Sequence, residues 1–216
     1  MEEKALANRP VGWYYTNMNI SKSQEELLLA FIDMASVEGI NAVSLSDIAK
    51  KVGKSKSTIF SHFTNKEEIV DNLYTYGVSL TSKEGLKISL KGSAMQVIRK
   101  SVDYWHRIYS EEPRRSFHRI VEMEKYRDSR ALTISKSLDA MVYSQTLVIL
   151  SELSDTRRLD IDELDLASES FAATILSYLG QSLIGDDEDL DWKEDRFINR
   201  FCNHYAVKKE NILFDA

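Results

Sequence analysis

Hydrophobic residues recur with helical spacing along most of this chain. In residues 24–38 and 45–52 they return at every third or fourth position, which places them on one face of a helix. Stretches with the same spacing continue to residue 205. Residues that favour helix starts, and glycines that favour helix ends, separate the stretches. The pattern therefore predicts an all-α fold of about nine helices.

Two short helices joined by a tight turn are predicted between Ser44 and Lys66. Ser44, with Asp47 three residues later, can cap the first helix, and Gly53 can end it. The apolar face of this first helix consists of Leu45, Ile48, Ala49 and Val52. Ser55 can cap the second helix.

The second short helix has one apolar and one polar face. Ile59 and Phe63 lie four residues apart on the apolar face. The opposite side carries short polar residues and their neighbours, namely Ser57, Ser61, Thr58 and His62. The apolar pair can anchor such a helix while the polar row approaches base edges in the major groove of DNA.

The charge distribution agrees with a nucleic-acid contact. The whole chain has a formal net charge of −6, yet residues 44–66 contain one acid and five lysines: Lys50, Lys51, Lys54, Lys56 and Lys66. A local basic patch on an acidic protein favours the docking of phosphates. The alternative is a solvated pair of lysine-rich surface helices.

These residues resemble a known DNA-binding signature. The motif comprises Asp47-Ile48-Ala49, Val52-Gly53, the run from Ser55 to Phe63 and the run from Asn65 to Ile69. In this order and spacing it resembles the signature of the TetR family of bacterial repressors. The resemblance covers residues 25–74. It implies a homodimer with an all-helical ligand-binding domain and a DNA-binding domain that the ligand releases.

The resemblance also implies roles for individual residues. Ser44 and Lys66 correspond to phosphate-contacting positions, and Phe60, Ser61 and His62 correspond to positions that contact the DNA backbone. The turn and the start of the recognition helix, which meet bases and backbone, correspond to Lys54, Ser55, Lys56, Ser57 and Thr58. Phe60 replaces a usual tyrosine and so loses a hydroxyl contact. Lys54 replaces a small or apolar residue, which can add a phosphate contact.

The predicted helices suggest three regions. Residues 1–23 form an N-terminal extension, residues 24–70 a three-helix DNA-binding domain, and residues 71–216 a larger helical bundle for ligand binding and dimerisation. Asn65, with Glu68 three residues later, can cap a helix that runs from the first domain into the second and links them mechanically. Residues 1–23 are either a flexible or locally packed extension or an arm that contacts the minor groove.

A ligand pocket is one possible use of the larger region. Its candidate lining residues combine aromatic, thioether and a few polar side chains, as small-molecule pockets do. They are Trp105, Tyr109, Phe117, Glu124, Met141, Gln145, Phe171 and Tyr178. For each of them, ordinary core packing is the alternative.

A dimer interface is the second possible use. The last two predicted helices carry small residues that allow close helix approach and aromatic residues that can be buried between subunits. The candidates are Ala172, Ala173, Ser177, Gly180, Phe197 and Phe201. The alternative is packing within one subunit. Asp191 and Glu194 predict a capping box at the start of the last helix.

Other classes of function find little support. The sequence contains no apolar run of membrane-spanning length and no secretion signal, and its single cysteine, Cys202, excludes an internal disulfide. We therefore expect a cytoplasmic location. The four histidines lack metal-ligand spacing, and no nucleophile–base group or glycine-rich phosphate loop is present. We expect no metal, no cofactor and no enzymatic activity.

The sequence thus predicts a dimeric, sequence-specific transcriptional regulator that binds an inverted-repeat operator in double-stranded DNA. We expect a repressor that an unidentified small-molecule effector releases from DNA. The alternatives are an activator or a ligand-independent regulator of the same type, and a protein-interaction module whose helix-turn-helix does not bind DNA.

Overall fold

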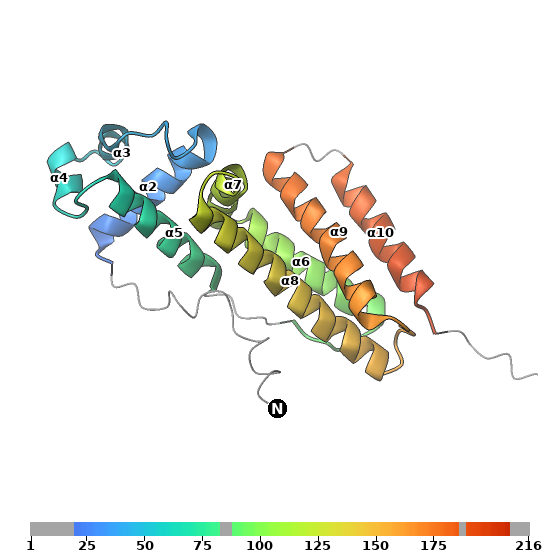
Figure 1. Ribbon diagram of the computed structural model, residues 1–216. Coiled ribbons are helices and arrows are strands. Elements are labelled where there is room, and N and C mark those ends of the chain that lie inside the picture. Colours follow the sequence, from blue (N-terminus) through green and yellow to red (C-terminus); the bar gives the residue numbers. More distant parts are fainter. Residues whose placement is uncertain (1–19, 83–87, 186–188, 208–216) are drawn as a thin grey trace, which may run out of the picture.

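The computed structural model describes residues 20–82, 88–185 and 189–207, and the elements within them are all helices (Figure 1). In chain order these are α2 (Lys22–Glu38), α3 (Leu45–Lys51), α4 (Lys56–Phe60), α5 (Lys66–Ser82), α6 (Ala94–Ser110), α7 (Arg114–Glu124), α8 (Ser129–Asp155), α9 (Leu164–Ile184) and α10 (Leu190–His204). The predicted all-α fold is confirmed, with nine helices in the described part of the chain. Most of the predicted extension, residues 1–19, lies outside the described residues.

Side-chain caps set several helix starts. Ser44 and Asp47 form the predicted capping box of α3: the Asp47 N–H donates to Ser44 Oγ at 3.2 Å, and the Ser44 N–H donates to the Asp47 carboxylate at 3.1 Å. A second box joins Ser21 and Gln24, so α2 begins at Lys22, two residues before the predicted start.

The predicted capping box at the start of the last helix is wrong. Helix α10 begins at Leu190, whose side chain is buried, before Asp191 could act as a cap. The Glu194 carboxylate instead lies 2.8 Å from Nε2 of His106 on α6. This hydrogen bond raises the pKa of His106 and joins α10 to α6.

The buried apolar residues form two cores. One core lies among α2, α3, α4, α5 and α7 and includes the first turns of α8. The other lies among α6, α8, α9 and α10. Met141 on α8 packs against both cores. The buried apolar residues of α7 therefore lie in the core that includes the helix-turn-helix, while Arg115 of α7 donates to the backbone oxygen of Ser182 on α9.

Helices α5 and α7 approach each other closely at Gly77. A Cβ atom at this position would lie 2.1 Å from ring atoms of Phe117. The Phe117 side chain is fully buried. Glycine is therefore the residue that lets the Phe117 ring pack directly on the backbone of α5.

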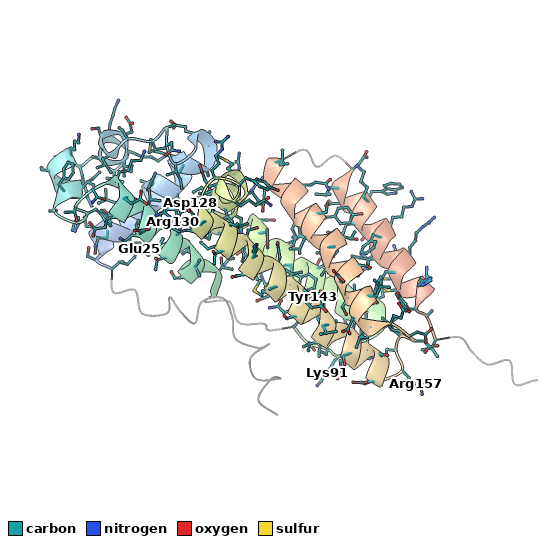
Figure 2. The ribbon with its side chains drawn as sticks, viewed as in Figure 1. Glu25, Lys91, Asp128, Arg130, Tyr143 and Arg157 are labelled. Atoms are coloured by element: carbon teal, nitrogen blue, oxygen red, sulfur yellow. The ribbon has the colours of Figure 1, made fainter. Side chains whose placement is uncertain are left out.

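The helix-turn-helix and the α9–α10 pair occupy opposite ends of the molecule (Figure 1). Glu25 lies near the α4 end, Asp128 and Arg130 lie where α5 meets α8, and Lys91 and Arg157 lie at the far end (Figure 2). None of the described helices has the length and apolarity that crossing a membrane requires.

Candidate nucleic-acid interface

Helix α4 presents a polar face to solvent. Within and directly after it, Ile59 and Phe63 are buried, with exposed fractions of 0% and 2%. Lys56, Ser57 and Ser61 are exposed. The predicted division of this helix into an apolar inner face and a polar outer face is therefore present in the structure.

The hydroxyl groups at the start of α4 contact one another. Ser55 Oγ accepts a hydrogen bond from the Thr58 N–H at 3.3 Å and so caps the helix. The same Oγ lies 2.7 Å from Ser57 Oγ and 3.0 Å from Thr58 Oγ1. Each hydroxyl can both donate and accept, so this row can exchange its internal hydrogen bonds for contacts with bases or phosphates.

Three of the five lysines contact no carboxylate among the described residues. Lys50 and Lys56 are exposed, and Lys56 Nζ lies 5.8 Å from the ring centroid of Phe60, which is itself 50% exposed. Lys66 Nζ donates to the backbone oxygen of Asn41 at 3.1 Å. These three side chains supply the positive charge that the surface around α4 can offer to phosphates.

The other two lysines form ion pairs with α2. Lys51 pairs with Asp33, and Lys54 Nζ lies 2.6 Å from Glu26 Oε2. Lys54 Nζ also donates to Ser23 Oγ at 2.9 Å. The ammonium group of Lys54 thus points to α2, and its contact with DNA phosphate stays a prediction.

His62 also contacts α2. Its Nε2 atom lies 3.1 Å from Ser23 Oγ, and the imidazole is half-buried. Ser23 was not among the predicted site residues, because it fell within the predicted extension. The Ser21–Gln24 capping box, which marks an earlier helix start, was the signal that could have revealed it.

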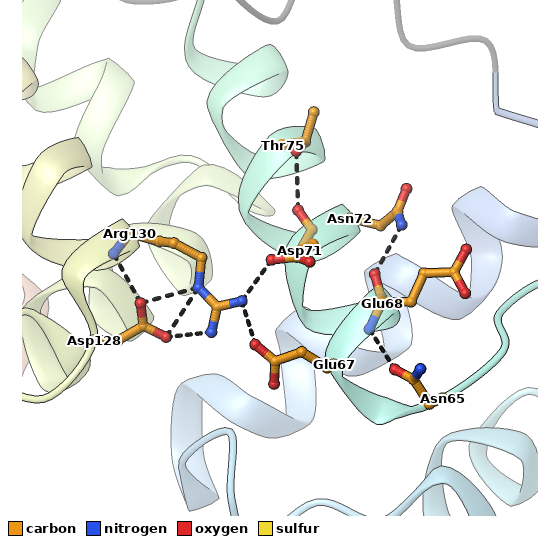
Figure 3. A network of polar contacts seen from close by, with 8 residues as sticks. All are labelled: Asn65, Glu67, Glu68, Asp71, Asn72, Thr75, Asp128 and Arg130. Atoms are coloured by element: carbon orange, nitrogen blue, oxygen red, sulfur yellow. Dashed lines mark hydrogen bonds and ion pairs between the residues drawn. The ribbon is translucent and has the colours of Figure 1, made fainter.

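Helix α5 connects this surface to the rest of the molecule. Asn65 caps it, since Asn65 Oδ1 accepts from the Glu68 N–H at 2.9 Å (Figure 3). The Glu68 carboxylate accepts from the Thr64 N–H at 2.5 Å, one residue before the cap. The hydrogen bonds with Thr64 lower the pKa of Glu68. The negative side chains at this helix start also complement the helix dipole.

Arg130 joins the first two turns of α5 to the start of α8. Its guanidinium lies 2.7 Å from a Glu67 oxygen, 2.5 Å from an Asp71 oxygen and 2.6 Å from an Asp128 oxygen (Figure 3). It also lies 5.3 Å from the ring centroid of Tyr74. The hydrogen bonds from Arg130 lower the pKa of Asp128. Sequence patterns do not predict this network, because Arg130 lies about 60 residues from Glu67 and Asp71 and no local pattern joins them.

The predicted pocket residues are distributed over several contacts. Trp105 Nε1 donates to Gln145 Oε1 at 2.7 Å, which brings two of them together between α6 and α8. The other six candidates make separate contacts. Tyr109 stacks on His118, Phe117 packs on α5, and Phe171 and Tyr178 both contact the Phe197 ring. Glu124 is buried and Met141 is half-buried. A cleft of about 320 Å³ lies on α6, lined by Ile88, Ser89, Lys100, Asp103, Tyr104 and Arg107. None of the eight candidates lines this cleft, and their role as a pocket stays a prediction.

Some of the predicted dimer residues are buried within the protomer, and others are exposed or half-buried on its surface. Ala172 and Phe201 are buried inside the protomer, where the Phe201 ring packs against Phe171 at 4.8 Å between centroids. Ala173 and Ser177 are exposed on α9. Gly180 and Phe197 are half-buried, and a Cβ atom at Gly180 would contact nothing within 4 Å.

Two short helices, α3 and α4, follow each other across a tight turn at one end of an all-helical molecule, and α4 carries an outward polar row, which is the arrangement of helix-turn-helix DNA-binding proteins. Residues 23–73 match the family model of bacterial regulatory proteins of the tetR family. This segment therefore resembles the DNA-binding part of that family, and the chain shares the fold of solved transcriptional regulators, among them a TetR-family protein.

Solved structures share this fold along most of the chain. A protein from Saccharomonospora viridis, described as a transcriptional regulator in complex with choline, has 19% identity and a TM-score of 0.66, with 88% of this chain and 100% of that chain covered. MexZ, a repressor responsible for antibiotic resistance in Pseudomonas aeruginosa, has 16% identity and a TM-score of 0.64, with 87% and 96% covered. The fatty acid degradation regulator FadR from Bacillus halodurans has 15% identity and a TM-score of 0.59, with 89% and 98% covered.

Proposed function

We propose that this protein is a homodimeric repressor that binds an inverted-repeat operator and that a small-molecule ligand releases from DNA. The observation that carries the proposal is the solvent-facing row of hydroxyl groups on α4, flanked by Lys50, Lys56 and Lys66. Short polar side chains recognise bases, and lysines neutralise phosphates. Residues 24–70 would bind DNA, and residues 71–216 would bind the ligand and the second subunit.

The outer face of α9 supports dimerisation. Helical spacing places one row of residues along its outer face, namely exposed Leu166, Ser170, Ala173, Ser177 and Ile184, with half-buried Gly180 between the last two. The two apolar ends are 56% and 78% exposed, and the middle of the row is small enough for close approach of a second helix. A two-fold pair also doubles the number of base pairs that are recognised, which one helix-turn-helix needs in order to select a site in a genome.

The contacts of α5 support release by a ligand. Helix α5 begins at Lys66, packs on α7 at Gly77, and is joined to α8 through Arg130. A ligand that binds better to one arrangement of α6, α7 and α8 would thereby favour one orientation of α5 and of the helix-turn-helix. The choline complex of the S. viridis protein supports a small molecule as the effector.

The DNA experiment is selection of binding sites from a pool of random duplexes by the purified protein. We expect an inverted repeat whose half-site centres lie about 34–36 Å apart, or a multiple of that distance. Lys66→Ala should weaken binding to all duplexes alike and lower the salt slope by about one phosphate contact. Lys91→Ala, at the far end of the molecule, is the matched control and should leave the slope unchanged. Thr58→Ala should change base preference more than Ser44→Ala.

The alternatives predict other results. A protein-interaction module would enrich no duplex. An activator would raise the expression of a reporter placed behind the selected site, whereas a repressor would lower it. A ligand-independent regulator would stay bound when extracts of small metabolites are added.

A further inference from the structure

The start of α2 contacts the residues that flank α4 on both sides. Ser23 Oγ accepts a hydrogen bond from Lys54 Nζ at 2.9 Å and lies 3.1 Å from His62 Nε2, while Glu26 Oε2 lies 2.6 Å from the same Lys54 Nζ. Lys54 lies two residues before the first residue of α4, and His62 lies two residues after its last. Ser23, Glu26, Lys54 and His62, which we term the Ser23 cluster, thus join both ends of α4 to one turn of α2.

Helix α4 depends on such contacts for its orientation. It is five residues long, and Ile59 is its only buried residue. A helix of this length is not stable by itself, because few backbone hydrogen bonds offset the cost of ordering it. Besides Ile59, the nearest buried apolar side chain is that of Phe63, three residues after the end of α4, so both apolar anchors lie towards its C-terminal end. Polar contacts at both ends therefore help to fix its orientation.

We propose that Ser23 and Glu26 are positioning residues for DNA recognition, which fix the orientation of α4 through Lys54 and His62. The proposal rests on the proposed function, since it assumes that α4 enters the major groove. In this role Lys54 acts inside the protein and does not supply the phosphate contact that the family resemblance implies.

The Lys54–Glu26 ion pair is better suited to orienting α4 than to stabilising the fold. The hydrogen bond and charge of Lys54 lower the pKa of Glu26, so the Glu26 carboxylate stays ionised at neutral pH. The side chains of Lys54 and Glu26 are 26% and 46% exposed, and pairs of that exposure contribute little to folding. Their geometric effect is larger, because a small rotation of a recognition helix misaligns all of its base contacts.

The same turn of α2 also contacts α5. The Tyr76 hydroxyl donates to Glu25 Oε1 at 2.8 Å. Glu25 and Glu26 are adjacent, so one turn of α2 joins α5 on one side and α4 on the other. A shift of α5 would therefore be passed to the recognition helix through α2.

The test compares Ser23→Ala, Glu26→Ala and Lys54→Met with the wild type. Affinity is measured for the duplex that the wild type selects from the random pool, over a series of salt concentrations. We expect each variant to bind about threefold to tenfold more weakly, which corresponds to one lost hydrogen bond. The salt slope should stay unchanged, because no phosphate contact is lost. Because Glu26 and Lys54 act through one contact, the Glu26→Ala, Lys54→Met double variant should bind with the same affinity as the single variant that binds more weakly.

Matched variants separate this effect from general electrostatics and from misfolding. Glu38→Ala removes the same charge from an exposed position at the other end of α2 and reports how a lost acid alone changes affinity. Ser23→Thr keeps the hydroxyl and should retain wild-type affinity. The thermal midpoint of each variant shows that it is folded.

Two results would overturn the proposal. If Lys54 moves to a phosphate when DNA binds, Lys54→Met lowers the slope by about 0.9, and Glu26→Ala strengthens binding beyond the Glu38→Ala control. If the Ser23 cluster has no positioning role, Ser23→Ala and Glu26→Ala bind as their controls do. In both cases the wild type still selects a duplex, so the proposed function stands. A wild type that selects no duplex contradicts the proposed function itself.

Discussion

At the scale of single residues, the most perturbed histidine of the described chain is His118. It is 2% exposed, and its ring stacks on Tyr109 of α6 with centroids 4.1 Å apart and planes 9° apart. Burial lowers its pKa to about 3, and the charge of Arg114 acts in the same direction. Its Nε2 atom has no hydrogen-bond partner among the described residues. The folded protein therefore holds a neutral imidazole at this position.

A pH dependence of stability follows from His118. Between pH 3 and about pH 6.5, the ordinary pKa of histidine, the unfolded chain binds one more proton here than the folded chain does. Stability must therefore fall as the pH drops through 6.5. Between pH 6.5 and 5 we expect a loss of about 2 kcal/mol, at about 1.4 kcal/mol per pH unit. Urea unfolding at pH 7, 6 and 5 measures it.

His118→Phe is the variant that isolates this effect. A phenyl ring can keep the stack on Tyr109 and cannot be protonated. The variant should lose little stability between pH 6.5 and 5, a range above the ordinary pKa of carboxyl groups. His106 acts in the opposite direction, because Glu194 raises its pKa and its contribution is lost as the pH rises above about 6.5. If the stability difference between the wild type and His118→Phe is the same at pH 7 and at pH 5, the buried, neutral state of His118 is contradicted.

Local patterns predicted which residues of α4 are buried, but not what the polar residues contact. Helical spacing alone separates Ile59 and Phe63 from Ser57 and Ser61, because burial follows the period of the helix. The partner of Lys54 lies 28 residues away on α2 and depends on how the two helices cross. A single sequence gives no information on that crossing, so the contacts of Lys54 with α2 could not be predicted.

At the scale of elements, the contact between α5 and α7 is the closest approach that the described glycines show. The Phe117 ring occupies the space that a side chain at Gly77 would need. Because α5 begins at the helix-turn-helix, this contact is one place where, under the proposed function, the larger part of the molecule would act on the DNA-binding end. The sequence left Phe117 as a candidate pocket residue with core packing as the alternative, because a sequence does not show which helix an aromatic side chain meets.

Gly77→Ala should destabilise the protein. Helix propensity alone would favour alanine by about 1 kcal/mol. The added Cβ would lie 2.1 Å from a fully buried ring, and overpacking of this kind costs about 1–3 kcal/mol. We expect a net loss of stability, measured as a lower urea midpoint. The Gly77→Ala, Phe117→Leu double variant should lose less than the sum of its single variants, because leucine frees space. A Gly77→Ala protein more stable than the wild type would contradict the close packing of Phe117 on the backbone of α5.

The boundaries of elements were predictable where a cap is local. Ser44 with Asp47 set the start of α3 through contacts within four residues, which a sequence displays directly. The predicted start of α10 was wrong because its determinants are not local. Glu194 bonds to His106, a residue 88 positions away, and the buried Leu190 begins the helix earlier.

At the scale of the whole molecule, DNA binding and dimerisation would take place at opposite ends of the protein. The α4 surface lies at one end, and the α9–α10 pair lies at the other (Figure 1). A dimer formed through α9 and α10 would leave both α4 surfaces available to one face of DNA. Apolar side chains exposed on α9, which are Leu166 and Ile184, are the surface that such a dimer would bury at about 25 cal/mol per Å².

Ala173→Arg tests this arrangement. Ala173 is exposed in the protomer, so the arginine should fold normally, whereas a two-fold contact would bring two arginines into the interface without partners. We expect a folded monomer with little operator binding, because one helix-turn-helix makes half the contacts of the pair. Light scattering gives the mass, and circular dichroism shows that the chain is folded. Ala140→Arg, the same change at an exposed alanine of α8, should remain a dimer that binds DNA. A folded Ala173→Arg dimer with wild-type operator affinity would place the interface on another face of the larger helical part.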